Sequence, residues 1–129
     1  MDYVKKTNEL AAEILDICFE IHRKLGPGLL ESVYEEILSF ELNSRSLAIK
    51  RQYIIPVQWK GITLNKAFVA DIIVENKVLI ELKSVETLSP TYAKQVITYL
   101  KLTNIKLGLL INFNEALLKH GIRRLVNNL

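Results

Sequence analysis

The chain has 129 residues, of which 50% are hydrophobic and 24% are charged. This composition is typical of a folded domain with one core, and it excludes a disordered or fibrous chain. A net charge of +3 is compatible with a polyanionic partner but is too small to identify one. We therefore predict a single domain over residues 1–129.

The apolar runs are far shorter than the roughly 20 residues that cross a bilayer. The stretch that starts at Met1 leads directly into a charged segment, without the basic start and apolar block of a secretory signal. These features predict a cytoplasmic protein with no membrane contact. Cys18 is the only cysteine, so an intrachain disulfide and a four-cysteine zinc site are both excluded.

Two helices are predicted in the first third of the chain. Apolar residues recur every three or four positions from about Tyr3 to Leu25, and Gly26-Pro27-Gly28 ends this helix. A second helix is predicted from Leu29 to about Ser44. Its expected core stripe is Leu30, Val33, Ile37 and Phe40, and the neighbouring stripe carries Glu31, Tyr34, Glu35 and Leu38.

Extended segments follow the two helices. Residues 48–59 are rich in Ile, Val, Tyr and Trp, which favours a strand, and Lys60-Gly61 supplies a turn. A hairpin is predicted next, with arms Ala67–Val74 and Val78–Lys83 and the polar connection Glu75-Asn76-Lys77.

The last third of the chain predicts a helix, a buried strand and a terminal element. The helix runs from Ser89-Pro90 to about Leu102, and residues 106–112 read as a fully buried strand. Residues 115–126 have a helical pattern that Gly121 should interrupt. The order of elements predicts an α/β (α+β) fold with a mixed central sheet flanked by helices.

Charged residues occur where the hairpin should be covered on both faces. Leu79, Glu81 and Lys83 share one face of the second arm, and counting outward from a three-residue loop places Asp71 directly opposite Glu81. Two opposed carboxylates repel each other, so they suit Mg²⁺ or Mn²⁺, which needs only one or two carboxylates. Spacing alone leaves a structural ion-pair network open as the alternative.

Asp71, Glu81-Leu82-Lys83 and a following helix with Gln95 and Tyr99 resemble the PD-(D/E)XK nuclease superfamily. The resemblance implies an αβββαβ core and metal-dependent hydrolysis of phosphodiester bonds in nucleic acid. Ala70 stands where the proline of the superfamily name would be.

A narrower resemblance concerns the start of the second helix. Residues 28–34 match the GxxExxY signature of one family within the superfamily. The match continues through residues 110–113 and 121–124, and it covers nearly the whole chain.

The resemblance also implies roles for individual residues. Asp71 and Glu81 are expected to bind the metal, and the main-chain carbonyl of Leu82 is expected to be a further ligand. Lys83 is expected to orient or help deprotonate the attacking water. Glu31 is expected to be a supporting acid, or else only to brace the helix near its N-terminus, where a negative charge is favoured.

Two further groups have both a functional and a structural interpretation. Gln95 and Tyr99 lie one helical turn apart, so Gln95 could hold a water or phosphate while Tyr99 bonds Lys83 or the backbone. Lys119, Arg123 and Arg124 could bind phosphates, although basic residues near a terminus are usually only solvated.

Two functions therefore remain open at this point. The first is a Mg²⁺- or Mn²⁺-dependent endonuclease that acts on DNA or RNA. The alternative is a catalytically silent nuclease-fold module that binds nucleic acid or a protein. A homodimer or a partner protein is compatible with either function.

Overall fold

A computed structural model of the chain describes residues 2–129, except for the side chains of Lys66 and Ala67. The elements are α1 (Asp2–Leu25), α2 (Glu31–Ser44), β1 (Ile49–Trp59), β2 (Ile62–Val74), β3 (Val78–Lys83), α3 (Pro90–Thr103), β4 (Leu107–Asn112), the short 3-10 helix η1 (Leu118–Gly121) and β5 (Ile122–Val126). None of the helices in this described part is long and apolar enough to cross a membrane.

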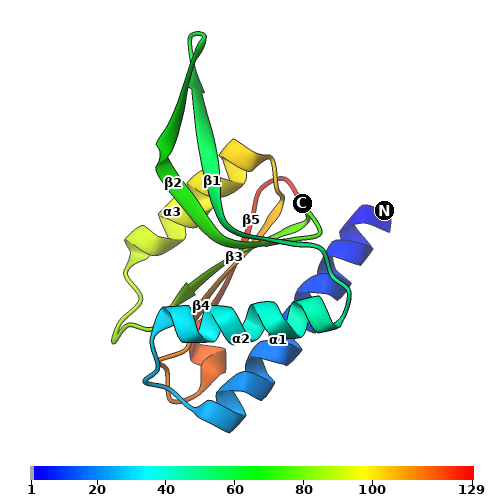
Figure 1. Cartoon of the computed structure of the whole chain (residues 1–129), viewed down its shortest axis with the longest axis vertical. Coiled ribbons are helices and arrows are strands. Elements are labelled where there is room, and N and C mark those ends of the chain that lie inside the picture. The colour runs from blue at the N-terminus through cyan, green and yellow to red at the C-terminus, as the bar shows by residue number, and fades with distance from the viewer. Residues whose placement is uncertain (1) are drawn as a thin grey trace.

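The five strands form one mixed sheet in the order β1-β2-β3-β4-β5 (Figure 1). Strands β3 and β4 run parallel and are connected through α3, and the other neighbours run antiparallel. The succession α2-β1-β2-β3-α3-β4 is the expected αβββαβ core, with α1 before it and β5 after it. The predicted fold class is confirmed.

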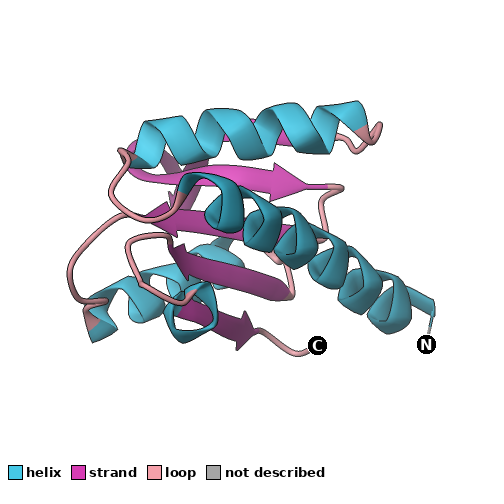
Figure 2. Cartoon of the chain, turned by 90° about the horizontal axis from the view of Figure 1, so that it is seen from below, coloured by secondary structure: helices cyan, strands magenta, loops and turns pink. Residues whose placement is uncertain are grey.

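Helices cover both faces of the sheet (Figures 1 and 2). Helices α1 and α2 pack on the face that carries Val78, Ile80 and Leu82 of β3. Helix α3 packs on the other face, where Leu79 meets Tyr99. Strands β3 and β4 are therefore buried on both sides, and this explains why their sequences are apolar almost without interruption.

The buried face of α2 is not the predicted one. Two residues of the expected core stripe are largely exposed, Leu30 at 72% and Phe40 at 67%. The neighbouring stripe is buried instead: Tyr34, Glu35, Leu38 and Leu42. Tyr34 accounts for this rotation of the helix, because its hydroxyl donates a 2.5 Å hydrogen bond to the Gly26 carbonyl and its ring stacks on Phe113. The predicted core stripe was wrong.

The C-terminal segment also differs from its prediction. Residues 115–126 form η1 and β5 rather than a helix, and β5 pairs with β4 at the edge of the sheet. The predicted interruption at Gly121 is confirmed. A β-carbon there would lie 2.4 Å from the Asn112 carbonyl oxygen, so only glycine fits this close approach.

The first hairpin is longer than expected. Strand β2 begins at Ile62 rather than at Ala67, and it pairs with β1 from Ile62 to Val74. The turn at Lys60-Gly61 is confirmed, with positive φ at both residues. The β1–β2 hairpin consequently projects beyond the helices, at the top of Figure 1.

Candidate active site

The register of β2 and β3 is the predicted one. The three-residue turn 75–77 joins the strands, and Ile72 pairs with Ile80. The next positions along the two strands are Asp71 and Glu81. Main-chain pairing ends between these two positions, so the strands begin to separate where the two acids lie.

The two carboxylates replace the missing main-chain hydrogen bonds. The Asp71 N–H donates to Glu81 Oε1 at 2.8 Å, and the Leu82 N–H donates to Asp71 Oδ2, also at 2.8 Å. One oxygen of each carboxylate is used in this way. Asp71 Oδ1 and Glu81 Oε2 take no part in these two hydrogen bonds.

The charges of the two acids oppose each other in a poorly solvated place. Glu81 is only 5% exposed, and burial followed by the nearby charge of Asp71 raises its pKa to about 8. Burial also raises the pKa of Asp71, and the charge of Glu35 adds to that rise. Keeping both acids ionised at neutral pH is therefore costly unless a cation lies between them.

Lys83 lies at the end of β3 on the α3 side. Its Nζ lies 4.4 Å from the centroid of the Tyr92 ring, within the range of a cation–π contact. The charge of Lys83 lowers the pKa of Asp71 and of Glu81, so all three groups interact electrostatically. Lys83 therefore contacts Tyr92, and of the two partners predicted for Tyr99, Lys83 or the backbone, the backbone is the one found, at Val69.

Glu35 is the acid of α2 whose charge affects Asp71. Its side chain is buried, and Arg51 donates two hydrogen bonds to its Oε2, at 3.2 Å and 3.0 Å. Gln52 Nε2 donates to Glu35 Oε1 at 2.6 Å and to Asp71 Oδ1 at 3.3 Å. Sequence reasoning missed these three residues, and the only signal was that Glu35 shares a stripe of α2 with Tyr34 and Leu38.

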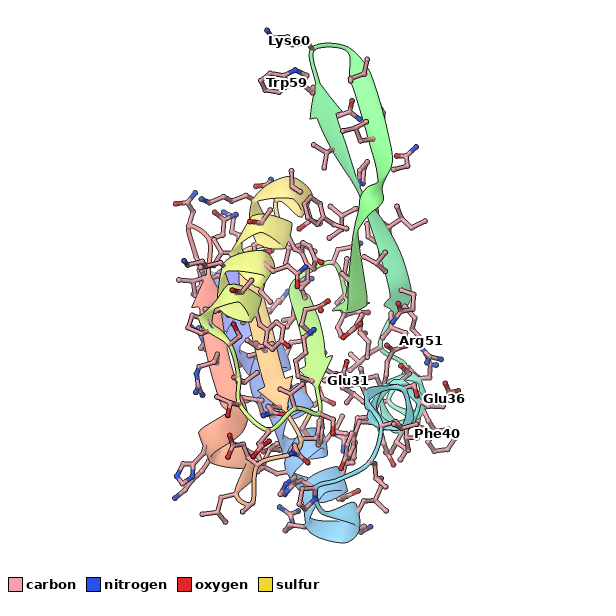
Figure 3. All side chains as sticks on the ribbon, turned by 90° about the vertical axis from the view of Figure 1, so that its left-hand side faces the viewer. Glu31, Glu36, Phe40, Arg51, Trp59 and Lys60 are labelled. Atoms are coloured by element: carbon pink, nitrogen blue, oxygen red, sulfur yellow. The ribbon has the colours of Figure 1, made fainter. Side chains whose placement is uncertain are left out.

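Glu31 lies elsewhere, at the N-terminus of α2 (Figure 3). Its Oε2 accepts a 3.3 Å hydrogen bond from the Ser84 N–H, and Ser84 Oγ donates to the Leu29 carbonyl at 2.6 Å. A surface hollow of about 460 Å³ adjoins these groups. Glu31 therefore connects the start of α2 to the chain just after Lys83.

Asn112 fixes the same segment from β4. Its Nδ2 donates to the Val85 carbonyl at 2.9 Å, and its Oδ1 accepts from the Val85 N–H at 3.0 Å. The Phe113 N–H donates to the Lys83 carbonyl at 2.9 Å. These contacts hold the chain on the C-terminal side of Lys83 and so limit the movement of its side chain.

Gln95 and Tyr99 lie one turn apart on α3, and Tyr99 packs in the cluster that contains Leu79 of β3 and Phe68 of β2. Tyr99 is buried, and its ring meets that of Phe68 edge-on at 5.5 Å between centroids. Burial and the charge of Glu81 raise the pKa of the Tyr99 hydroxyl, so Tyr99 lies close enough to Glu81 to sense it. Gln95 is half-buried one turn earlier.

The predicted basic group is spread out. Arg123 and Arg124 are consecutive residues of β5 and point to opposite faces of the sheet. Arg123 donates to two nearby main-chain carbonyls, Arg124 donates to Asn8 of α1, and Lys119 lies on η1. These three exposed residues do not form one patch.

The donor set suits a hard, hydrated cation. In residues 2–129 no three side chains of the His, Cys, Asp or Glu type gather into a ready-made metal cage. Mg²⁺ needs only one or two carboxylates, because it keeps several waters. The paired acids therefore fit Mg²⁺ or Mn²⁺ rather than zinc, which prefers four protein nitrogen or sulfur ligands.

Comparison with known proteins gives one match. A family model described as the PD-(D/E)XK nuclease superfamily matches residues 8–125. This range includes most of α1, most of β5 and every helix and strand between them. No curated protein and no solved structure matches the chain significantly. The match and the αβββαβ core lead to the same assignment: the chain belongs to the PD-(D/E)XK nuclease superfamily.

Proposed function

We propose that this chain is a metal-dependent nuclease of the GxxExxY family, built as a single domain, that hydrolyses phosphodiester bonds in nucleic acid. Membership of a nuclease superfamily supports the chemistry. One observation carries the proposal further. Asp71 and Glu81 meet where β2 and β3 separate, and burial, followed by repulsion from Asp71, raises the pKa of Glu81 to about 8.

Asp71 and Glu81 would hold Mg²⁺ or Mn²⁺ through the oxygens that their backbone hydrogen bonds leave free, with the Leu82 carbonyl as a further ligand. A divalent cation bound there supplies charge stabilisation at the phosphate and lowers the pKa of a coordinated water. Gln52 holds Asp71 in place from the side of β1 and connects it to the buried Glu35.

Lys83 is the residue that we assign to the attacking water and the phosphate. Its ammonium group lies over Tyr92, where it can donate hydrogen bonds to both. Gln95 would hold a water or a phosphate oxygen from α3, and Tyr99 would support the Glu81 side of the site. Glu31 positions the end of β3 through Ser84.

Cleavage of labelled DNA and RNA in Mg²⁺ or Mn²⁺ tests the proposal. The wild type should cleave at least one of them, and Asp71→Asn, Glu81→Gln and Lys83→Ala should each lower the rate by about 100-fold or more. Glu9→Gln, at an exposed acid of α1, is the matched control and should cleave like the wild type. Absence of cleavage, or equal cleavage by the Asp71 and Lys83 variants, rejects the nuclease.

A second function has its own supporting observation. Asp71 and Glu81 already accept hydrogen bonds from opposite main chains, which is the arrangement expected if the acids only join the two strands. The chain would then be a silent nuclease-fold module that binds nucleic acid or a protein. Mn²⁺ should raise the melting temperature of a nuclease but not of Asp71→Asn, whereas it should leave a silent module unchanged.

A further inference from the structure

The β1–β2 hairpin extends far beyond the part that the fold requires. Within the described residues, the part of β2 before Asp71 pairs with β1 alone, while residues 72–74 also pair with β3. An isolated two-stranded ribbon is only marginally stable in water. A projecting ribbon of this length therefore calls for a role outside the core.

The tip of this hairpin is apolar and exposed. Trp59, labelled in Figure 3, is 61% exposed just before the turn, and Ile62 is 55% exposed just after it. Lys60 Nζ lies 5.3 Å from the centroid of the Trp59 ring. Burial in the core explains neither Trp59 nor Ile62. An indole, an aliphatic side chain and an ammonium group together suit a ligand that has both an apolar face and a negative charge.

The charge of the sequence around the hairpin indicates the class of ligand. Residues 42–70 contain five basic residues and no acid, whereas the rest of the chain has twelve basic and fourteen acidic residues. The positive excess of the protein therefore belongs to this segment. Arg45 and Arg51 are paired with acids of α1 and α2, and Lys50 lies over the Tyr53 ring. Among the described side chains, Lys60 is then the basic group beside the exposed apolar tip.

Among the described side chains of the tip, one lysine beside a tryptophan favours unpaired nucleotides over a duplex. Tight duplex binding uses many phosphate contacts, about 6 to 10 in typical cases. Unpaired bases bind by stacking on aromatic rings and need fewer charges. Building on the nuclease proposed above, we propose that the tip binds unpaired bases of the nucleic-acid substrate, with Trp59 stacking on a base and Lys60 contacting a phosphate.

The length of β2 sets the distance between the hairpin tip and the proposed cleavage site. Nine residue steps separate Ile62 from Asp71, which corresponds to about 30 Å at the usual rise per residue. A stacked strand advances about 3.4 Å per nucleotide. The base bound by Trp59 should then lie at most about nine nucleotides from the cleaved phosphate, and fewer if the strand is stretched.

Trp59 is the only tryptophan of the chain, so intrinsic tryptophan fluorescence reports on the hairpin tip alone. We suggest titrating the full chain, in chelator to prevent cleavage, with a single-stranded deoxythymidine oligomer of about 20 nucleotides and with a duplex of equal length. The single strand should quench or shift the fluorescence in a saturable and salt-dependent way. It should bind more tightly than the duplex.

Variants separate the tip from the rest of the surface. In anisotropy with the labelled single strand, Trp59→Ala should weaken binding by about 5- to 150-fold, the range for loss of one stacked base. Trp59→Phe, which keeps an aromatic face, should restore most of the affinity. Leu117→Ala removes an equally exposed apolar side chain on another part of the molecule and should bind like the wild type.

The failure of this proposal can be told apart from failure of the nuclease. If the wild type cleaves nucleic acid but its fluorescence does not respond and Trp59→Ala binds normally, only the hairpin proposal is wrong. Preference for the duplex overturns the assignment to unpaired bases. A dimer in sedimentation that Trp59→Ala dissociates, without nucleic-acid binding, shows that the tip is a protein interface and also overturns it.

Discussion

Glu81 is the residue on which the chemistry of the site depends most. A carboxyl group that is almost fully buried beside a second acid is unfavourable in a purely structural role, because burial and repulsion both oppose its ionisation. Metal ions remove this penalty by placing positive charge between the acids. Burial and the neighbouring Asp71 account for the raised pKa of Glu81, and a metal ion bound between the two acids would offset both effects.

The pH dependence of stability follows from this pKa. On folding, the pKa of Glu81 rises from 4.5 to about 8. Between these two pH values the folded protein therefore holds a proton that the unfolded chain releases. The resulting stabilisation is complete below about pH 4.5 and is lost as the pH rises through about 8. We expect the melting temperature of the metal-free protein to fall over this range, as thermal melting in chelator would show.

Glu81→Gln provides the control for this measurement. The amide is uncharged at every pH, so the melting temperature of this variant should fall much less as the pH rises. Near pH 8 the variant should melt above the wild type. Glu9→Gln should follow the wild-type curve, because that acid is exposed on α1. Parallel curves for the wild type and Glu81→Gln would mean that Glu81 titrates normally in the folded protein.

At the scale of elements, periodicity predicted where α2 lies but not how it is rotated. Leu30 and Phe40 are as hydrophobic as Leu38, so the sequence offered two adjacent stripes and no local reason to choose between them. Tyr34 and Glu35 decide the rotation, through Phe113 and Arg51. These partners are far away in the sequence, and a helical pattern contains no information about them.

The rotation of α2 predicts a contrast between two truncations. Leu38→Ala should lower the free energy of unfolding by about 2–5 kcal/mol, because it leaves a cavity under a fully buried side chain. Phe40→Ala should change it by no more than about 0.5 kcal/mol, because Phe40 is exposed. Denaturant unfolding measures both, and a larger loss for Phe40→Ala would restore the originally predicted core stripe.

Strands were predicted more accurately than the last segment of the chain. Strands β3 and β4 lie inside the sheet, and burial on both faces makes their sequences apolar and easy to recognise. Strand β5 lies at the edge and exposes alternate residues, so its short pattern also fits a helix. Pairing with β4 determines its conformation, and that pairing is a tertiary contact.

At the scale of the whole molecule, the site combines parts that the sequence reveals with parts that it does not. The opposition of Asp71 and Glu81 follows from a three-residue turn and the alternation of a strand, and both can be counted. The Glu35–Gln52 link and the position of Lys83 over Tyr92 depend on how α2 and α3 pack on the sheet. Counting residues cannot provide those contacts.

Strand β2 connects the candidate active site to the exposed tip of the β1–β2 hairpin. Asp71 lies on β2 where that strand leaves the sheet, and the same strand continues outward to the exposed tip. In Figure 3, Trp59 and Lys60 lie at the far end of this hairpin from Arg51 and Glu36. In the proposed nuclease, a nucleic-acid strand bound at the site would follow β2 toward the tip, so that cleavage and base binding would occur at the two ends of one hairpin.

Anomalous diffraction from crystals grown with Mn²⁺ tests the central claim most directly. We expect one anomalous peak between the carboxylates of Asp71 and Glu81, at roughly 2.0–2.2 Å from an oxygen of each, and no such peak in Asp71→Asn crystals. A Mn²⁺ peak elsewhere, or none while both acids keep only their bonds to the opposite main chains, would contradict the metal site and the nuclease built on it.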